Sequence, residues 1–100
     1  MSLGKADLAA TTLTTIYTCG VGKVGTCNVS ICNRNASAVT VRLAIAAAAT
    51  PTASEWLEYD AAIAANSVLE RSGVVLQANE LIVAYSSATN VNVQVYGFED

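Results

Sequence analysis

Hydrophobic and polar residues alternate with a period of two in three segments of the chain. Residues 25–32 (GTCNVSIC), 39–46 (VTVRLAIA) and 90–98 (NVNVQVYGF) each place aliphatic side chains on one face and mostly smaller or more polar ones on the other. Because successive side chains of a strand point to opposite faces, this pattern predicts three half-buried strands. Residues 33–38, between the first two strands, are rich in turn formers, so we predict that these two strands form a β-hairpin.

Five shorter segments are rich in β-branched or aromatic residues and are bounded by Gly, Asn, Ser or Pro. They are residues 13–18, 56–60, 68–72, 74–76 and 81–86. Seven or eight short strands with such spacing are typical of an antiparallel sandwich or barrel. The sequence therefore predicts an all-β protein, a single small antiparallel β-sandwich or jelly-roll-like domain of seven to eight short strands.

The alanine-rich residues 44–49 could begin a helix, because alanine has the highest helix propensity. Pro51 biases Thr50 away from helical geometry, however, and the preceding residues already fit a strand. We expect residues 52–55 to form a loop with at most one capped turn.

A chain of 100 residues has the size of one domain. Residues 13–100 are expected to form the sandwich, and residues 1–12, where the pattern is weak, are a candidate extended N-terminal arm. We take residues 13–18 and 91–98 as candidate edge strands, since they contain no Lys, Arg or Pro. The predicted core consists of Val29, Ile31, Val39, Val41, Leu43, Ile45, Leu57, Leu69, Leu81, Val83, Val91, Val93 and Val95.

The composition adds that the surface must be nearly neutral, since hydrophobic residues make up 53% of the chain and charged residues only 13%. With five basic residues and a net charge of −3, no basic surface for nucleic acid or anionic membranes is expected. The first residues do not resemble a secretory signal, and no apolar run has the length of a membrane span. We therefore expect a protein that folds in a cytosol.

Few residues offer chemistry. The chain has no histidine, which removes the commonest general base and most zinc sites. Residues 20–25 (GVGKVG) match the dinucleotide-binding pattern G-x-G-x-x-G, but they lead into a predicted strand instead of a helix, so we interpret them as a turn. No cofactor, metal or catalytic residue is predicted, and the protein is expected not to be an enzyme.

Two carboxylates, Glu58 and Asp60, are predicted to share one strand face, with Glu55 nearby. Such a pair could hydrolyse a glycoside or hold a calcium ion. Acidic residues on a solvated strand face are more often paired with a cation on a neighbouring strand, and Arg42 or Arg71 is the expected partner.

The three cysteines, Cys19, Cys27 and Cys32, lack the spacing of a metal knuckle. Cys27 and Cys32 fall on opposite faces of one predicted strand, so they cannot bond each other. Cys19 and Cys27 are interpreted mainly as buried small hydrophobic residues, although a poorly placed bond between them stays open. Cys32 occupies the outward face, and Cys32 and Cys19 are candidates for a reactive thiol or an interchain disulfide.

The order of short motifs along the chain resembles that of small virion structural proteins of tailed bacteriophages. The likeness runs from about residue 8 to residue 100 through LAATTLTTIYT, GVGKVG, ICNRNASAVTVRLAIA, PTASEWLEYDAAIAANSVLERSGVVL and NVNVQVYGFED. The resemblance implies a decoration or cement protein of the phage head, or alternatively a tail, neck or fibre component. The cysteines depart from this pattern, in which Val or Ala would be expected.

The resemblance also implies partners and a location. The location is the virion, which is assembled in the host cytoplasm. The partners are further copies of the chain, in a homo-oligomer, and other virion proteins such as the major capsid protein. A trimer is favoured, because head-decorating proteins commonly sit where three capsid subunits meet. Short outward Ala, Thr and Asn side chains suit permanent packing against neighbours. The candidate assembly contacts are Leu3, Leu8, Tyr96 and Phe98.

A carbohydrate-binding sandwich is the alternative from another class of function. It would use exposed aromatic rings as stacking platforms. The candidates are Trp56, Tyr59, Tyr85 and Tyr96.

Overall fold

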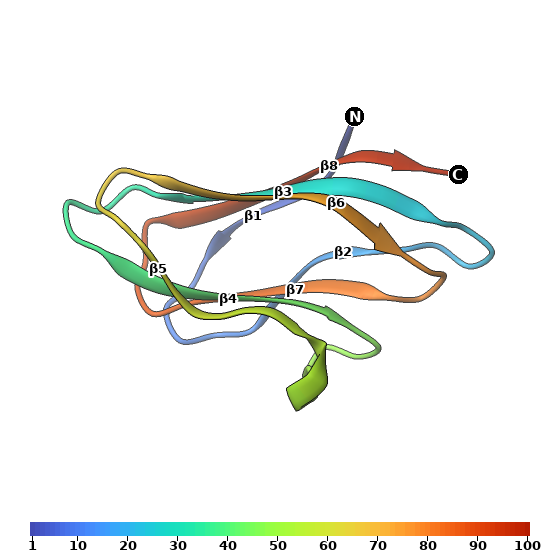
Figure 1. Cartoon of the computed structure of the whole chain (residues 1–100), viewed down its shortest axis with the longest axis horizontal. Helices are drawn as coiled ribbons and strands as arrows, with labels where there is room; N and C mark the ends of the chain where they lie inside the picture. Colours follow the sequence, from blue (N-terminus) through green and yellow to red (C-terminus); the bar gives the residue numbers. More distant parts are fainter.

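Two four-stranded antiparallel sheets pack face to face in the computed structural model, which describes residues 1–100 (Figure 1). Sheet A has the strand order β1-β8-β3-β6, and sheet B has the order β2-β7-β4-β5. No helix is long and apolar enough to cross a membrane. The elements are β1 (Ser2–Leu8), β2 (Thr14–Thr18), β3 (Gly25–Asn33), β4 (Val39–Ala46), the 3₁₀ turn η1 (Ala53–Glu55), β5 (Trp56–Ile63), β6 (Val68–Leu76), β7 (Leu81–Ser86) and β8 (Val91–Glu99).

The strand pairing is that of a jelly roll. β1 pairs with β8, β2 with β7, β3 with β6 and β4 with β5, and every pair is antiparallel. This pairing arises when one long hairpin, with its tip between β4 and β5, is rolled up so that successive pairs fall alternately into two sheets. The predicted all-β jelly-roll-like sandwich is confirmed, with eight strands.

The predicted hairpin between residues 25–32 and 39–46 is wrong. β3 lies in sheet A and β4 in sheet B, so residues 34–38 cross from one sheet to the other. Alternation shows which face of a strand is buried but not which strand lies beside it, and the buried faces of β3 and β4 meet across the core. The predicted segments 68–72 and 74–76 are one strand, β6, whose register shifts near Gly73 (φ +68°).

The first residues belong to the sandwich and do not project as an arm. Ser2–Leu8 form β1, which pairs with β8 along its length, and Ala10 bridges to Ser86. β8 is therefore an inner strand of sheet A, and the prediction that residues 91–98 form an edge is wrong. The edges are β1 and β6 in sheet A and β2 and β5 in sheet B.

The core lies between the sheets and contains most of the predicted residues. Val29, Ile31, Val39, Val41, Leu43, Val91, Val93 and Val95 are buried in it, as expected. Ile45, Leu57 and Leu69 pack against it but are only partly buried, because β5 and β6 are edge strands and Ile45 lies beside their gap.

The predicted facing of β7 is reversed. Leu43 of the core lies opposite Ala84, while Ala44 on the other face lies opposite Val83, so Leu81 and Val83 point away from the core. Ile82 and Ala84 take the inner positions instead.

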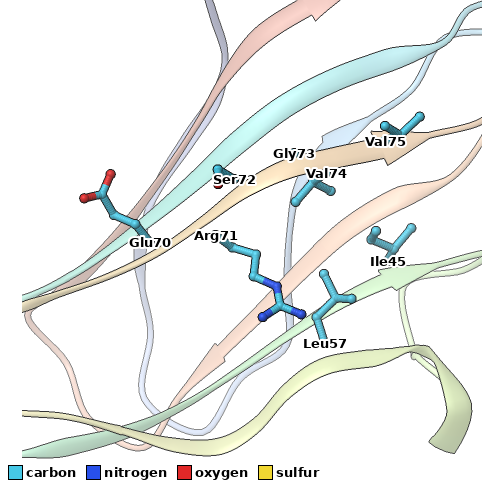
Figure 2. Close-up of a pocket in the computed structure, with 8 residues that line it drawn as sticks. All are labelled: Ile45, Leu57, Glu70, Arg71, Ser72, Gly73, Val74 and Val75. Carbon is cyan, nitrogen blue, oxygen red and sulfur yellow. The ribbon is translucent and has the colours of Figure 1, made fainter.

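One side of the sandwich is closed and the other is open. At the closed side β1 crosses β2 so tightly that a Cβ on Gly4 would lie 2.2 Å from the carbonyl oxygen of Ile16. At the open side the edge strands β5 and β6 diverge and leave a cleft (Figure 2).

Candidate functional site

The outer face of sheet B carries a second small group of buried residues. Ala44, Ala46 and Val83 point away from the core between the sheets, yet none of them is exposed to solvent. Trp56 lies opposite Ala44 in the register, and the loop that carries η1 returns beneath this sheet (Figure 1). Covered positions on an outer sheet face show that the large side chains around them form a packed surface layer.

That surface layer is an aromatic group with an arginine at its centre. The Arg42 guanidinium carbon lies 4.2 Å from the ring centroid of Tyr59 and 4.7 Å from that of Tyr85. Trp56 and Tyr59 meet edge to face, with ring centroids 5.4 Å apart and ring planes at 70°. We call Arg42, Trp56, Tyr59 and Tyr85 the aromatic group.

Asp60 fixes the orientation of Arg42. Its two carboxylate oxygens accept hydrogen bonds of 2.7 Å from Nε and 3.4 Å from Nη2, so one edge of the guanidinium is held at two points. Asp60 has a positive φ of 53°, at an irregularity in the pairing of β4 with β5. The hydrogen bond to Asp60 raises the pKa of Arg42 above its ordinary value, so the group carries a permanent positive charge.

A shallow depression of about 290 Å³ lies beside this group and is lined by Ala53, Trp56 and Tyr59. This size is at the lower end for ligand sites and suits a single ring. The loop that supplies Ala53 is held by Glu55, whose carboxylate accepts hydrogen bonds from the backbone N–H of Thr52 (2.8 Å) and Ala47 (3.1 Å). The predicted capped turn at residues 52–55 is therefore present.

The cleft at the open side is bridged by an ion pair. Arg71 of β6 extends between the sheets toward Leu57, and its Nη1 lies 3.0 Å from Oε2 of Glu58 in β5 (Figure 2). Glu58 thus pairs with Arg71 and Asp60 with Arg42, as expected for ordinary surface carboxylates. The prediction that they share one strand face is wrong, because the irregular pairing of β5 turns Glu58 toward the cleft and Asp60 toward the outer face of sheet B. Because the two carboxylates are engaged by different arginines, they do not form a site together. Nor does any group of three acidic or cysteine side chains form a metal site.

The outer face of sheet A has a different character, because its centre carries short polar side chains. Asn28, Ser30 and Cys32 of β3 lie opposite Tyr96, Gln94 and Asn92 of β8. Tyr96 reaches across β3, with its hydroxyl 3.5 Å from Oε2 of Glu70 in β6. A second shallow depression lies over β1 and β8 and is lined by Lys5, Ala6, Asp7, Arg34, Asn92, Val93 and Gln94.

The four predicted assembly contacts are not equivalent. Phe98 (67% exposed) and Tyr96 (37%) lie on the outer face of sheet A and are free to meet a partner. Leu3 is half-buried against the core. Leu8 is 3% exposed and belongs to the core, since it faces Val91 from the inner side of β1, so it is wrong as a contact residue.

The cysteines divide as their predicted facing requires. Cys19 and Cys27 are buried, and burial raises the pKa of the Cys27 thiol. Cys32 is half-exposed on the outer face of sheet A, and all three thiols are free. Cys19 has no exposed surface and cannot reach a neighbouring chain, so it is wrong as an interchain candidate.

The predicted carbohydrate platforms are only partly brought together. Trp56, Tyr59 and Tyr85 converge on sheet B, whereas Tyr96 lies on sheet A. The sequence alone does not predict that Arg42 lies among these aromatic rings, because this position depends on β4 lying between β5 and β7. The only sequence signal for this position is the pair of opposite charges, Arg42 on one strand and Asp60 on another.

The glycine segment 20–25 leads from β2 in sheet B to β3 in sheet A, with Gly25 as the first residue of β3, and Gly22 takes a positive φ of 72°. It leads into a strand, as predicted, so no helix N-terminus is present to face a phosphate. No protein-family model, no curated protein and no solved structure matches the chain, so the functional interpretation depends on the geometry described above.

Proposed function

We propose that this chain is a non-enzymatic structural component of a bacteriophage virion, most simply a decoration or cement protein on the head. The observation that carries the proposal is the complete jelly-roll pairing within 100 residues, because this architecture recurs in viral capsid proteins. The resemblance of motif order to small phage virion proteins supports the same assignment. A place in the tail, neck or fibre is the alternative within this class.

The surface supports a role in assembly. The outer face of sheet A is broad, has few charges and carries exposed Phe98, Val75 and Tyr96, a combination that favours contact with another protein. Its central side chains are short, so a partner can approach closely with little loss of side-chain entropy. The partners we propose are further copies of the chain and other virion proteins such as the major capsid protein.

The test is the copy number of the chain in purified particles, measured by quantitative mass spectrometry against the major capsid protein. A number comparable with that of the capsid protein is the expected result and indicates the head surface. A few copies per particle would move the chain to the tail, neck or fibre. Absence from washed particles would overturn the virion assignment.

Carbohydrate binding is the second candidate function, and the aromatic group favours it. Tyr59 is 57% exposed beside Trp56, and the Arg42–Asp60 pair, which lies against the Tyr59 ring, supplies hydrogen-bonding groups. Sugar rings bind proteins through such a combination of an aromatic surface and fixed polar groups. The ligand class is a neutral or acidic pyranose.

A glycan array with the isolated domain tests this candidate. Trp56→Ala should abolish any binding, whereas Tyr96→Ala, an aromatic substitution on the opposite sheet, should leave it unchanged. No binding to any glycan by the wild-type chain would eliminate the candidate.

A further inference from the structure

A row of four side chains crosses the whole outer face of sheet A with opposite charges at its ends. Lys5 of β1 lies opposite Gln94 of β8, Gln94 lies opposite Ser30 of β3, and Ser30 lies opposite Glu70 of β6. Lys5 and Glu70 are both exposed and occupy the two edge strands. The face is therefore positive at one edge and negative at the other along the same row.

One end of the same face is apolar. Phe98 of β8, Thr26 of β3 and Val75 of β6 form a parallel row, separated from the first by the row of Asn28 and Tyr96. In this row Phe98 is 67% and Val75 55% exposed. Val24 (48% exposed) follows on the same face of the chain, and Tyr96 adjoins Phe98. We call Val24, Val75, Tyr96 and Phe98 the apolar end.

Two copies of the chain can be placed with their sheet A outer faces in contact, related by a two-fold axis that runs parallel to the strands between β8 and β3. This axis brings the charged row and the apolar end of one copy onto those of the other. This rotation exchanges the two edges of the face, so Lys5 of one copy meets Glu70 of the other, twice. It leaves each row at its own height along the strands, so the apolar end of one copy covers the apolar end of the other. One symmetry operation thus pairs Lys5 with Glu70 and places the two apolar ends together.

We propose that the outer face of sheet A binds the same face of a second copy of this chain in a two-fold symmetric dimer. Sheets packed face to face keep their strand directions within about 30° of each other, which this axis provides. The contact is isologous, since the same surface is used by both copies, and such contacts close as dimers. A cyclic trimer would instead use two different patches of each copy, and this face would not pack against itself.

The size of the face sets the strength of the contact. Four strands and about seven residues span roughly 19 by 23 Å, or about 450 Å² on each copy. A total of roughly 900 Å² is below the roughly 1,200 Å² of stable specific interfaces, so we expect a weak, reversible dimer. Such a contact would be strengthened by holding both copies on one particle.

This inference rests on the assembly role proposed for sheet A, but its test uses the purified chain and not the virion. The mass in solution is measured by sedimentation equilibrium over a wide range of chain concentrations. The wild-type chain should approach twice its 10.3 kDa mass. A monomer at all concentrations, or a trimer, would overturn the dimer, while the copy number in particles tests the virion assignment separately.

Charge reversal tests the symmetry. Lys5→Glu or Glu70→Lys alone places like charges opposite each other twice and should weaken the dimer by about tenfold or more. The double variant, Lys5→Glu with Glu70→Lys, again places opposite charges against each other. Its dissociation constant should be close to that of the wild type. Lys23→Glu, the same charge change in the loop before β3, is the control and should have little effect. Failure of the double variant to recover while its melting temperature is unchanged would refute the axis.

The apolar end gives a second, independent readout. Phe98→Ser should weaken the dimer. Val21→Ser, which removes an 82% exposed side chain from the loop between β2 and β3, should not. Cys32 lies on the same face, between Asn92 and Val68, so its rate of alkylation should fall as chain concentration rises. Alkylation that is independent of concentration, in a chain shown to dimerise, would place the contact elsewhere.

Discussion

The hydroxyl of Tyr17 donates a hydrogen bond of 2.7 Å to Oε1 of Glu99, and this contact joins β2 of sheet B to β8 of sheet A. The same carboxylate oxygen accepts a bond of 2.9 Å from the backbone N–H of Gly20. These bonds lower the pKa of Glu99, with the Tyr17 hydrogen bond as the largest cause. Burial, followed by the bond to Glu99, raises the pKa of Tyr17, so its hydroxyl stays protonated as the donor.

Acidification should therefore destabilise the fold. A carboxyl group whose pKa is lower in the folded chain contributes stability above its unfolded pKa, about 4.3 for Glu, and loses it as the pH falls through the folded value. Glu55, whose pKa is also lowered by backbone hydrogen bonds from Thr52 and Ala47, acts in the same direction. We expect the melting temperature to fall between about pH 5 and pH 3.

Glu99→Gln isolates one part of this effect, since the amide can still accept the Tyr17 and Gly20 hydrogen bonds but does not ionise. The variant should melt lower than the wild type at pH 7 and should lose less stability on acidification. Parallel melting curves for the two proteins would show that Glu99 does not contribute to the pH dependence.

Gly4→Ala should destabilise the protein by about 1–3 kcal/mol, as overpacking does in other closely packed sites. The new Cβ would lie 2.2 Å from the backbone oxygen of Ile16, so β1 and β2 would have to separate. Ser2→Ala, on the exposed face of β1, is the control and should change stability by no more than about 0.5 kcal/mol. Urea unfolding measures both, and equal effects would contradict the close approach.

Asn33→Ala should cost about 1–3 kcal/mol, because Asn33 is fully buried and binds three backbone carbonyls. Its Nδ2 lies 3.0–3.1 Å from the oxygens of Ser37, Ile63 and Ala64, and its Oδ1 accepts the N–H of Asn35. The side chain thereby joins the two connections at this end of the sandwich. Gln77→Ala, which removes an exposed amide, should be nearly neutral in the same urea measurement, and a similar loss in both would refute this role.

Alkylation of the folded chain should modify Cys32 and spare Cys19 and Cys27. The reason is that Cys32 is half-exposed while the other two thiols are buried. Mass spectrometry of the intact chain should show one adduct under native conditions at low chain concentration and three after unfolding. Loss of the native adduct in Cys32→Ser is the matched check, and labelling of Cys27 in the folded chain would contradict the facing of β3.

Alternation in the sequence is sufficient to orient β3, β4 and β8, because large aliphatic side chains alternate with polar or small ones in each of them. It fails for β7, where residues 81–84 (LIVA) are apolar on both faces. Val83 is buried beneath the outer layer of sheet B, and a strand covered on both sides shows no period of two.

Alternation does not predict which strands pair with each other. β3 and β4 are separated by only five residues and still lie in different sheets. The same limit applies to the candidate sites. Trp56, Tyr59 and Tyr85 can be selected as exposed aromatic residues, but the position of Arg42 between Tyr59 and Tyr85 depends on the strand order and on the positive φ of Asp60.

The jelly-roll pairing also determines when the molecule can be completed during synthesis. β1 emerges first, yet its only neighbour in sheet A is β8, which is translated almost 90 residues later. At about 5–20 residues per second, β1 remains without its partner for roughly 5–20 seconds. The inner pair, β4 and β5, can form long before that. We therefore expect the sandwich to close from the hairpin tip outward, with the residues of β1 fixed last.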